Sequence, residues 1–267
     1  MRTKLIILGC GNSMGTPRID GHWGKCDKKN KKNFRTRCSA IIQKGKNYIL
    51  IDTSPDIKNQ LNQNKIKNVS SVIYTHEHSD QTNGLFELRP FAFIKKKKKK
   101  INFWNDNNPV NIYGNSKTIS LLKKRFDYCF KKITIYPPIV KSNLVKKSFF
   151  LGKLKERIHF KTIQLKHGAV KVTCYIFNKT AYLSDCNDSS IIYRKELYNL
   201  NNIIIDCLNL KSNYAHFGLE ECLHINKMLK PKKMILTNLH YNLDYNYLLK
   251  RLPKNIKPAY DGMQLIL

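Results

Sequence analysis

Acidic residues are scarce in this sequence. Only 18 aspartates and glutamates stand against 49 lysines and arginines among 267 residues, which gives a formal net charge of +31. Such an excess ordinarily indicates a polyanionic partner such as RNA, DNA or an acidic membrane. Here lysine is scattered along the chain together with abundant Asn and Ile, as AT-rich codon usage would produce, and only the run Lys95–Lys100 is dense. We therefore do not favour nucleic acid as a partner, and we expect Lys95–Lys100 to be a solvated loop.

Long apolar runs are also missing. No stretch approaches the roughly 20 apolar residues that a membrane-spanning helix needs. The first residues, MRTK, lead straight into the strand-like LIILG, and no long apolar segment or small-residue cleavage site follows. These absences argue against a membrane partner and favour a cytoplasmic protein. The eight cysteines include no Cys-x-x-Cys pair, so we expect reduced thiols. The oligomeric state stays open at this point, a homodimer included.

Flexible linkers and short-period repeats are absent as well. The chain is long enough to bury a sizeable core, and its hydrophobic fraction of 42% is typical of a globular protein. We therefore expect a single domain over residues 1–267.

Short apolar runs and helix-like segments follow one another along the chain. The early runs KLIILG, SAIIQ and NYILIDT are strand candidates, and KGKN between the last two indicates a tight hairpin. Ser54 is a candidate N-cap, with Pro55 at the first helical position. Hairpins followed by strands that alternate with helices predict an α+β fold with layers around two sheets. The expected helices are Ser54 to Gln63, Ser116 to Cys129, Ser189 to Tyr198, Leu219 to Leu229 and Asn242 to Leu252.

One strand candidate is followed by residues of the types that bind metals. In YTHEHSDQTNG, His76, His78 and Asp80 come directly after the apolar run SVIYT. Alternate residues at a strand end project to the same side, so His76 and His78 can approach one ion together, while a turn brings Asp80 to a neighbouring position. A lone His-x-His would more often be an ordinary polar pair, but the added aspartate and the strand-end position favour a metal site.

Three further candidates come at the ends of later strand candidates. His167 precedes a glycine in TIQLKHG, Asp185 follows the apolar TAYL, and His240 lies a few residues past MILT. Taken singly, each has an ordinary explanation: His167 can be a turn residue, Asp185 a cap for the helix expected from Ser189, and His240 a loop residue. Taken together with the first cluster, they predict a metal centre built from several strand ends.

Several co-linear motifs give the sequence a family resemblance. They are LGCGNSMGTPR, RTRCSAII, ILIDTSPDI, YTHEHSDQTNGLFELRPF, LKHG, AYLSD, IIIDCL, AHFGLEECL, TNLHYNLDY and PAYDGM. On these motifs the chain resembles the metallo-β-lactamase-fold hydrolases, and within that superfamily the branch containing the phosphoribosyl 1,2-cyclic phosphate phosphodiesterase. The resemblance implies an αββα sandwich, two mixed β-sheets flanked by helices, with the active site along one edge where strand-end loops meet.

The resemblance also implies two divalent ions, Zn²⁺ or Mn²⁺. Two such ions lower the pKa of a water that bridges them, and the resulting hydroxide attacks phosphorus while the ions stabilise the phosphate charge. The implied ligands are, for one ion, His76, His78 and His167, for the other, Asp80 and His240, and, bridging both, Asp185.

One position departs from the family pattern. Gln81 stands where the commonest motif, His-x-His-x-Asp-His, has a second-site histidine. An amide oxygen is neutral and a poorer zinc ligand than imidazole. The departure predicts a weaker or more oxygen-rich second site, or a Gln81 that only orients a water or a ligand side chain.

Two residues are expected to act in catalysis. His216, in NYAHFGLEE, lies just before a helix candidate, and the resemblance gives the histidine at this place the role of general acid toward the leaving oxygen. The alternative for His216 is a residue at a helix start without chemistry. Asp80, beside the expected ions, is the other catalytic candidate.

A structural zinc site is a further expectation. The related phosphodiesterase carries an extra zinc in an insertion near GHWGKCDKKNKKNFRTRC, where His22, Cys26 and Cys38 could be ligands here. Structural zinc sites are almost always four-coordinate, so this set is incomplete.

The leading functional prediction is a metal-dependent phosphodiesterase that acts on a small cyclic or nucleotide-like phosphate ester. A tRNA 3′-end processing nuclease of the same fold would suit the basic charge, but TNLHYNLDY and AHFGLEECL fit the phosphodiesterase branch better. Gln81 keeps a third alternative open, a non-hydrolytic metal-binding member that takes part in cofactor biosynthesis.

Overall fold

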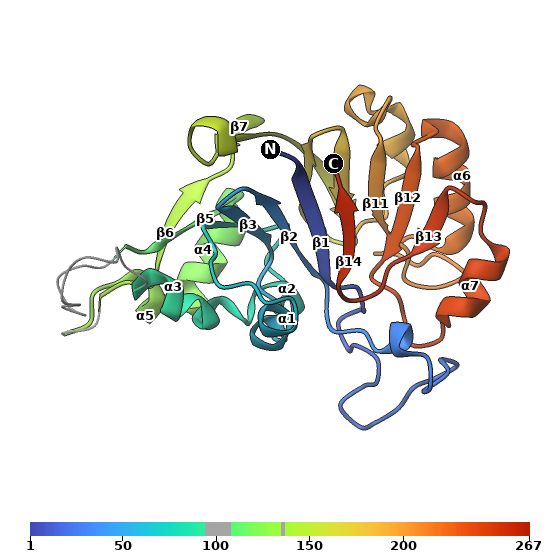
Figure 1. Cartoon of the computed structure of the whole chain (residues 1–267), viewed down its shortest axis with the longest axis horizontal. Coiled ribbons are helices and arrows are strands. Elements are labelled where there is room, and N and C mark those ends of the chain that lie inside the picture. The colour runs from blue at the N-terminus through green and yellow to red at the C-terminus, as the bar shows by residue number, and fades with distance from the viewer. Residues whose placement is uncertain (94–107, 135–136) are drawn as a thin grey trace.

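Two mixed β-sheets form the centre of the computed structural model, which describes residues 1–93, 108–134 and 137–267 (Figure 1). The run Lys95–Lys100, expected as a solvated loop, lies outside these residues. The first sheet has the spatial order β14 (Met263–Ile266), β1 (Thr3–Gly9), β2 (Ser39–Lys44), β3 (Asn47–Ile51), β4 (Ser71–Ile73), β5 (Val110–Gly114) and β6 (Val140–Leu144). The second sheet has the order β13 (Ile256–Pro258), β12 (Lys233–Thr237), β11 (Asn202–Asp206), β10 (Thr180–Leu183), β9 (Val170–Phe177), β8 (Ile158–His167) and β7 (Ser148–Leu151).

The two sheets share one pattern of strand directions. In the first, β14, β1, β2 and β3 pair antiparallel and β3 to β6 pair parallel. In the second, β7 to β10 pair antiparallel and β10 to β13 pair parallel. The hairpin expected at KGKN is confirmed, because Lys44 of β2 lies opposite Asn47 of β3.

Helices lie on the outer side of each sheet, which confirms the predicted αββα sandwich (Figure 1). No helix in the described ranges is long and apolar enough to span a membrane. On the side of the first sheet are α1 (Ile57–Gln63), α2 (Ser79–Thr82), α3 (Arg89–Phe93), α4 (Ser116–Arg125) and α5 (Asp127–Phe130), and on the side of the second are α6 (Leu219–Leu229) and α7 (Tyr245–Arg251). Short 3₁₀ turns are η1 (Lys31–Asn33), η2 (Leu85–Leu88), η3 (Leu154–Glu156), η4 (Ser189–Tyr193) and η5 (Lys195–Leu197).

Four of the five predicted helices differ from the structure. The helix expected over Ser116 to Cys129 is divided at Phe126 into α4 and α5, and the helix expected from Asn242 begins at Tyr245 with Asp244 as its N-cap. The α-helix expected from Ser189 is instead the pair of turns η4 and η5, because Arg194 takes an extended conformation between them. Helix α1 begins at Ile57 with Asp56 as its N-cap, so the cap predicted at Ser54 is wrong. The hydroxyl of Ser54 accepts the Asp56 N–H at 3.1 Å and so belongs to a turn just ahead of the helix.

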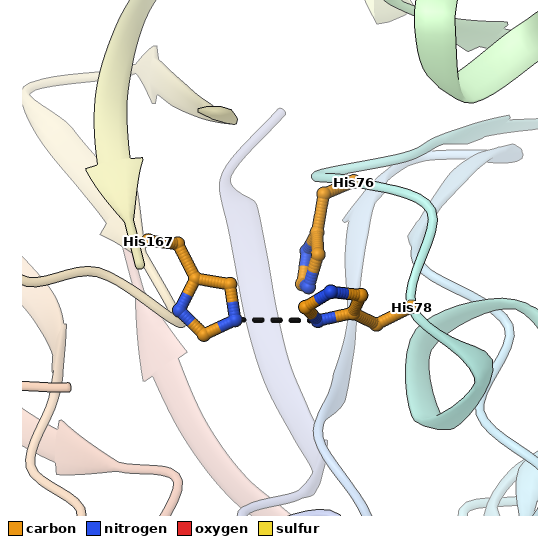
Figure 2. Close-up of side chains that lie close together, drawn as sticks. All are labelled: His76, His78 and His167. Atoms are coloured by element: carbon orange, nitrogen blue, oxygen red, sulfur yellow. Dashed lines mark hydrogen bonds between the residues drawn. The ribbon is translucent and has the colours of Figure 1, made fainter. Parts of the chain in front are cut away.

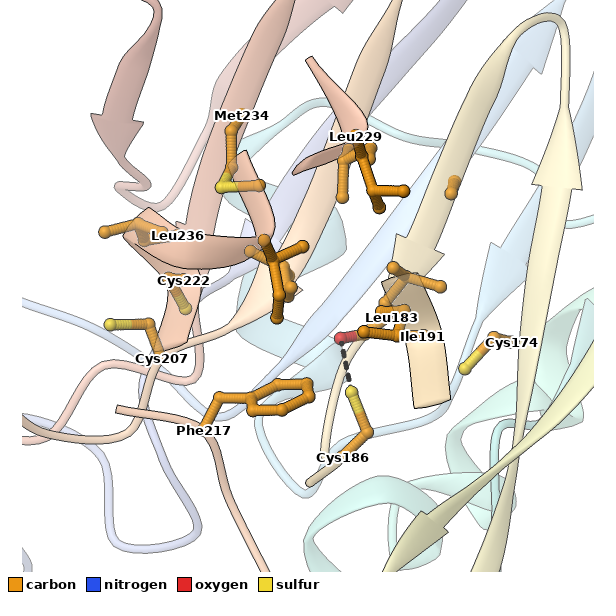
Figure 3. Packing of buried hydrophobic residues seen from close by; sticks show 14 of the residues in the cluster. Cys174, Leu183, Cys186, Ile191, Cys207, Phe217, Cys222, Leu229, Met234 and Leu236 are labelled. Atoms are coloured by element: carbon orange, nitrogen blue, oxygen red, sulfur yellow. Dashed lines mark hydrogen bonds between the residues drawn. The ribbon is translucent and has the colours of Figure 1, made fainter. Parts of the chain in front are cut away.

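Successive side chains of a strand point to opposite faces of its sheet, and the buried apolar residues accordingly form three layers: one between the two sheets and one between each sheet and its helices. In β1, Leu5 and Ile7 pack between the two sheets, whereas Ile6 and Leu8 pack toward the helices on the first sheet. Opposite faces of a strand carry alternate residues, so a strand with helices on one side and a sheet on the other is apolar throughout. The third layer lies between the second sheet and α6, and Figure 3 shows part of it. All eight cysteines are free and buried, in agreement with the expected reduced thiols.

Candidate metal centre

Three imidazole rings meet where β4 and β8 end (Figure 2). The ring centroids of His76 and His78 are 4.5 Å apart, and that of His167 lies 5.1 Å and 5.0 Å from them. The His167 Nε2 and His78 Nδ1 atoms are 3.3 Å apart. One ring nitrogen from each histidine lies within 4.8 Å of the others, so the three can bind one ion.

The ring of His76 is oriented by a hydrogen-bonded chain that begins at Asp52. The Thr75 hydroxyl donates to Asp52 Oδ2 at 2.8 Å, and His76 Nδ1 lies 3.0 Å from the same hydroxyl. The Thr75 hydroxyl uses its hydrogen in the bond to Asp52, so His76 Nδ1 is the donor to that hydroxyl and the lone pair is on Nε2. Burial raises the pKa of Asp52 to about 8, and the two hydrogen bonds from Thr75 oppose this rise. The His76 Nε2 atom is buried and has no hydrogen-bond partner in the part of the chain that the structure describes. A buried imidazole nitrogen with a free lone pair is what a metal ligand requires.

His167 is oriented in a similar way by the backbone. Its Nδ1 donates to the Ala215 carbonyl at 2.9 Å, which leaves the lone pair on Nε2. Burial lowers the pKa of His167 and holds the pKa of His76 well below its usual range, and the adjoining imidazoles add to both shifts. His76 and His167 are thus neutral imidazoles, and with a ring nitrogen of His78 within reach they fit a divalent ion such as Zn²⁺ or Mn²⁺.

Asp185 lies beside these rings and accepts a hydrogen bond on each of its oxygens. It follows β10, has a left-handed φ of 54° and is buried. Its Oδ2 accepts Gln81 Nε2 at 2.9 Å and its Oδ1 accepts Asn238 Nδ2 at 3.1 Å. Burial raises the pKa of Asp185 well above its usual range, and nearby carboxylates add to the shift. Donor atoms of Asp185, His167 and His216 form a second group within 4.8 Å.

His216, which is half-buried, forms an ion pair with the buried Asp206, the last residue of β11. Its Nδ1 donates to Asp206 Oδ2 at 2.7 Å. Burial lowers the pKa of His216, but the hydrogen bond and charge of Asp206, helped by Asp185 and Asp80, outweigh it and raise the pKa to about 9. The ring centroid of His216 lies 4.7 Å from that of His167, so the pair adjoins the three imidazoles.

Asp206 and Asn238 are site residues that the sequence did not suggest. Asp206 Oδ2 also accepts the Cys186 N–H at 2.9 Å, and Asp206 Oδ1 accepts Asn238 Nδ2 at 3.1 Å. Each comes at the end of a buried parallel strand, in IIID and in MILTN. A polar residue directly after such a strand was the available signal, since parallel strand ends meet at one edge.

Helix α2 brings Asp80 and Gln81 to the site. The Thr53 N–H donates to the Gln81 carbonyl at 2.8 Å, and the Gly84 N–H donates to the Thr53 carbonyl at 2.9 Å. A Cβ at Gly84 would lie only 2.1 Å from the Ser54 carbonyl oxygen, so only glycine permits this approach. Asp80, predicted as a metal ligand, is half-buried and belongs to neither group of donor atoms, but its charge acts on the carboxyl of Asp185 and on His216.

The structure does not bring His240 into either group of donor atoms. Its ring centroid lies 3.7 Å from that of Tyr241, and its Nδ1 accepts the Asn242 N–H at 3.2 Å. Asn238, immediately after β12, has a left-handed φ of 60° and occupies the site in its place. The chain then leads His240 away, and the His240 carbonyl accepts Arg35 Nη1 at 3.2 Å.

The residues considered for a structural zinc also do not gather into a donor group within the described chain. The ring of His22 lies edge-on to Tyr241, with centroids 5.3 Å apart. The Cys26 thiol contacts Arg35 Nη1 at 3.9 Å, and the Cys38 thiol lies 3.5 Å from the Thr237 hydroxyl. Burial raises the pKa of both thiols, so they have the properties of core residues.

An αββα sandwich with histidines and carboxylates at one sheet edge defines the class of metallo-β-lactamase-fold hydrolases. The sequence matches the family described as the beta-lactamase superfamily domain over residues 47–241. The chain therefore belongs to the beta-lactamase superfamily, whose members are mostly metal-dependent hydrolases.

Similar proteins cover nearly the whole chain. A diphosphatase of the PhnP family has 29% sequence identity and a TM-score of 0.83, with 100% of this chain and 98% of that one covered. The short form of human tRNase Z has 15% identity and a TM-score of 0.67, with 98% of each chain covered, and shows the fold alone. An octanoyltransferase from Porphyromonas gingivalis is 26% identical over 272 residues, which are 99% of this chain and 51% of that protein. The chain thus spans about half the length of this curated relative.

Proposed function

We propose that this chain is a metal-dependent phosphodiesterase that hydrolyses a small cyclic or nucleotide-like phosphate ester. The observation that carries the proposal is the set of three adjoining imidazoles, two of them held in orientation by hydrogen bonds, beside the His216–Asp206 pair. The full-length similarity to a diphosphatase of the PhnP family supports a phosphate substrate. The excess of positive charge also favours anionic substrates.

His76, His78 and His167 are the residues that would hold a divalent ion. Such an ion acts as a Lewis acid toward a phosphoryl oxygen. Thr75 and the Ala215 carbonyl keep the hydrogens of His76 and His167 on Nδ1, so both rings offer the same nitrogen to the site. Fixed ring orientations mean that little reorganisation accompanies binding.

His216 is the proposed general acid. Asp206 engages Nδ1 at 2.7 Å, which leaves Nε2 as the nitrogen that can give a proton to the leaving oxygen. A histidine so paired carries its proton at neutral pH, as an acid toward an alkoxide must. We also assign Asp80 a catalytic part, because its carboxylate lies at the same edge and acts on His216.

A nuclease is the second candidate, and the observation that favours it is the distribution of basic side chains. A cavity of about 820 Å³ beside β8 is lined by more basic than acidic residues. The basic ones are Lys146, Lys147, Lys166, Lys171 and Arg194, and the acidic ones are Asp188 and Glu196. The octanoyltransferase name of the curated relative is not carried over, since the chain spans about half of that protein.

The test is hydrolysis of bis(p-nitrophenyl) phosphate by the chain after treatment with a chelator and addition of Zn²⁺ or Mn²⁺. We expect turnover to be restored by the metal, and the His216→Ala variant to keep its metal but lose roughly a hundredfold in kcat. His224→Ala is the matched control, because His224 is exposed on α6 and belongs to neither donor group. Absence of metal-restored turnover would contradict the proposal, and cleavage of precursor tRNA in preference to small esters would favour the nuclease.

A further inference from the structure

Asp185, the carboxylate expected to bridge two ions, has an amide hydrogen on each of its oxygens. Gln81 Nε2 donates to Oδ2 at 2.9 Å, and Asn238 Nδ2 donates to Oδ1 at 3.1 Å. An amide nitrogen is a donor and has no lone pair to offer to a metal. A second cation bound at these oxygens would therefore meet the positive ends of two amide groups.

Asn238 also joins a second buried carboxylate to the first. Its other hydrogen goes to Asp206 Oδ1, also at 3.1 Å. The 3.1 Å contact between Asn238 Nδ2 and His216 Nδ1 adds no bond, because the hydrogen on Nδ1 is donated to Asp206. The side chain is almost fully buried, with Asn238 at 1% exposure. A neutral amide thus lies between two carboxylates, which is where a cation would otherwise be expected.

The donors that remain for a second ion are of a kind that suits zinc poorly. His240, the expected imidazole, lies against Tyr241 and belongs to neither donor group. Gln81 Oε1 is buried and has no hydrogen-bond partner among the described residues, and Asp80 offers a carboxylate. His216 is an imidazole of the second donor group, but its Nδ1 is held by Asp206 and it is the proposed general acid. Oxygen donors from Asp80, Gln81 and Asp185 then remain, and a set without imidazole is a poor site for zinc. Asp185, the buried carboxylate of this set, already accepts an amide hydrogen on each oxygen, which weakens it as a ligand to either metal.

We propose that Gln81 and Asn238 replace the second ion, so that the chain binds a single divalent ion at His76, His78 and His167. The two amides hold the buried Asp185 carboxylate by hydrogen bonds in place of a charge. This inference rests on the metal site of the proposed function but not on any particular ester.

The experiment measures how many divalent metal ions bind to each protein chain. The full chain is stripped with a chelator, loaded with excess Zn²⁺ or Mn²⁺, desalted and measured by plasma mass spectrometry against protein concentration. We expect one ion per chain, and an electron paramagnetic resonance spectrum of isolated Mn²⁺ without spin coupling. The double variant Gln81→His with Asn238→His should bind two ions and show a coupled spectrum, since imidazoles then replace both amides. Asn83→His is the matched control, because Asn83 is exposed at the end of α2, the helix that carries Gln81. This variant should still bind one ion.

The outcomes separate this inference from the proposed function. Two ions per wild-type chain, or a coupled Mn²⁺ spectrum, would overturn the replacement by amides while leaving a metal-dependent hydrolase intact. No bound ion would overturn both. A double variant that fails to fold does not affect the wild-type count, and a folded double variant that still binds a single ion would argue against the amides as the cause.

Discussion

Removal of one hydroxyl group tests whether the Asp52–Thr75–His76 chain orients a metal ligand. Thr75→Val keeps the shape of the side chain and removes the group that bonds Asp52 Oδ2 at 2.8 Å and His76 Nδ1 at 3.0 Å. Loss of such a supporting group typically weakens metal binding about 10- to 100-fold. That factor corresponds to about 1.4 to 2.8 kcal/mol of binding free energy.

The same substitution also has a cost in stability that can be separated from metal binding. Asp52 Oδ2 is fully buried and loses the hydroxyl, whereas Asp52 Oδ1 keeps the Thr75 backbone N–H at 2.8 Å. Leaving a buried acceptor unpaired costs about 1 to 3 kcal/mol of unfolding free energy. We therefore expect the metal-free variant to be less stable than the wild type in urea and, when folded, to bind Zn²⁺ more weakly.

Zinc affinity is measured by competition with a fluorescent chelator, and stability by urea unfolding in the presence of excess chelator. Thr180→Val is the matched control, because the buried Thr180 hydroxyl bonds Asn178 and Asn202 at the opposite end of β10 from Asp185. This control should lose stability and keep its zinc affinity. If folded Thr75→Val bound zinc as tightly as the wild type, or if the control lost affinity equally, the orienting role would be refuted.

Two further predictions concern stability. Gly84→Ala should cost about 1 to 3 kcal/mol in urea unfolding, since its Cβ would meet the Ser54 carbonyl, whereas Gly114→Ala, with its nearest atoms at 3.4 Å, should change little. Equal effects at the two glycines would contradict this. Burial raises the pKa of Asp261 to about 6, against hydrogen bonds from Thr36 and Cys10. The folded state then binds the proton more readily than the unfolded state, so this group makes stability fall as pH rises from about 4 to about 6. Asp261→Asn should remove this fall, by up to about 3 kcal/mol, and wild-type and variant profiles that run parallel from pH 3 to 8 would contradict the assignment.

The layered fold was predictable because strand periodicity and burial agree. In β1 every residue from Leu5 to Leu8 is apolar, as a strand between helices and a second sheet must be. The 3₁₀ turns that replace the helix expected from Ser189 could not be foreseen in the same way. The break between η4 and η5 lies at the extended backbone of Arg194, and intrinsic helix propensity is too weak a signal to predict such a break.

The three histidines proposed to hold one ion could also be predicted from strand geometry, since alternate residues at a strand end point to one side. This rule placed His76 and His78 together, and His167 at the end of β8 completes the set. The rule does not extend past Asn238, where a left-handed turn decides which side chain enters the site. A shift of two residues in such a turn exchanges an amide for the imidazole of His240, and the local sequence contains no hydrophobic periodicity that would reveal it.

The place of β1 in the first sheet has a consequence for synthesis of the chain. Figure 1 shows β1 between β2 and β14, and Ile7 pairs with Met263 across a sequence separation of almost the whole chain. While the chain emerges from the ribosome, β1 therefore keeps an open edge of unpaired N–H and C=O groups until Met263–Ile266 has been made. Open edges can pair with other chains and promote aggregation. Loss of Met263–Ile266 would make that exposure permanent, even though the candidate metal centre lies elsewhere.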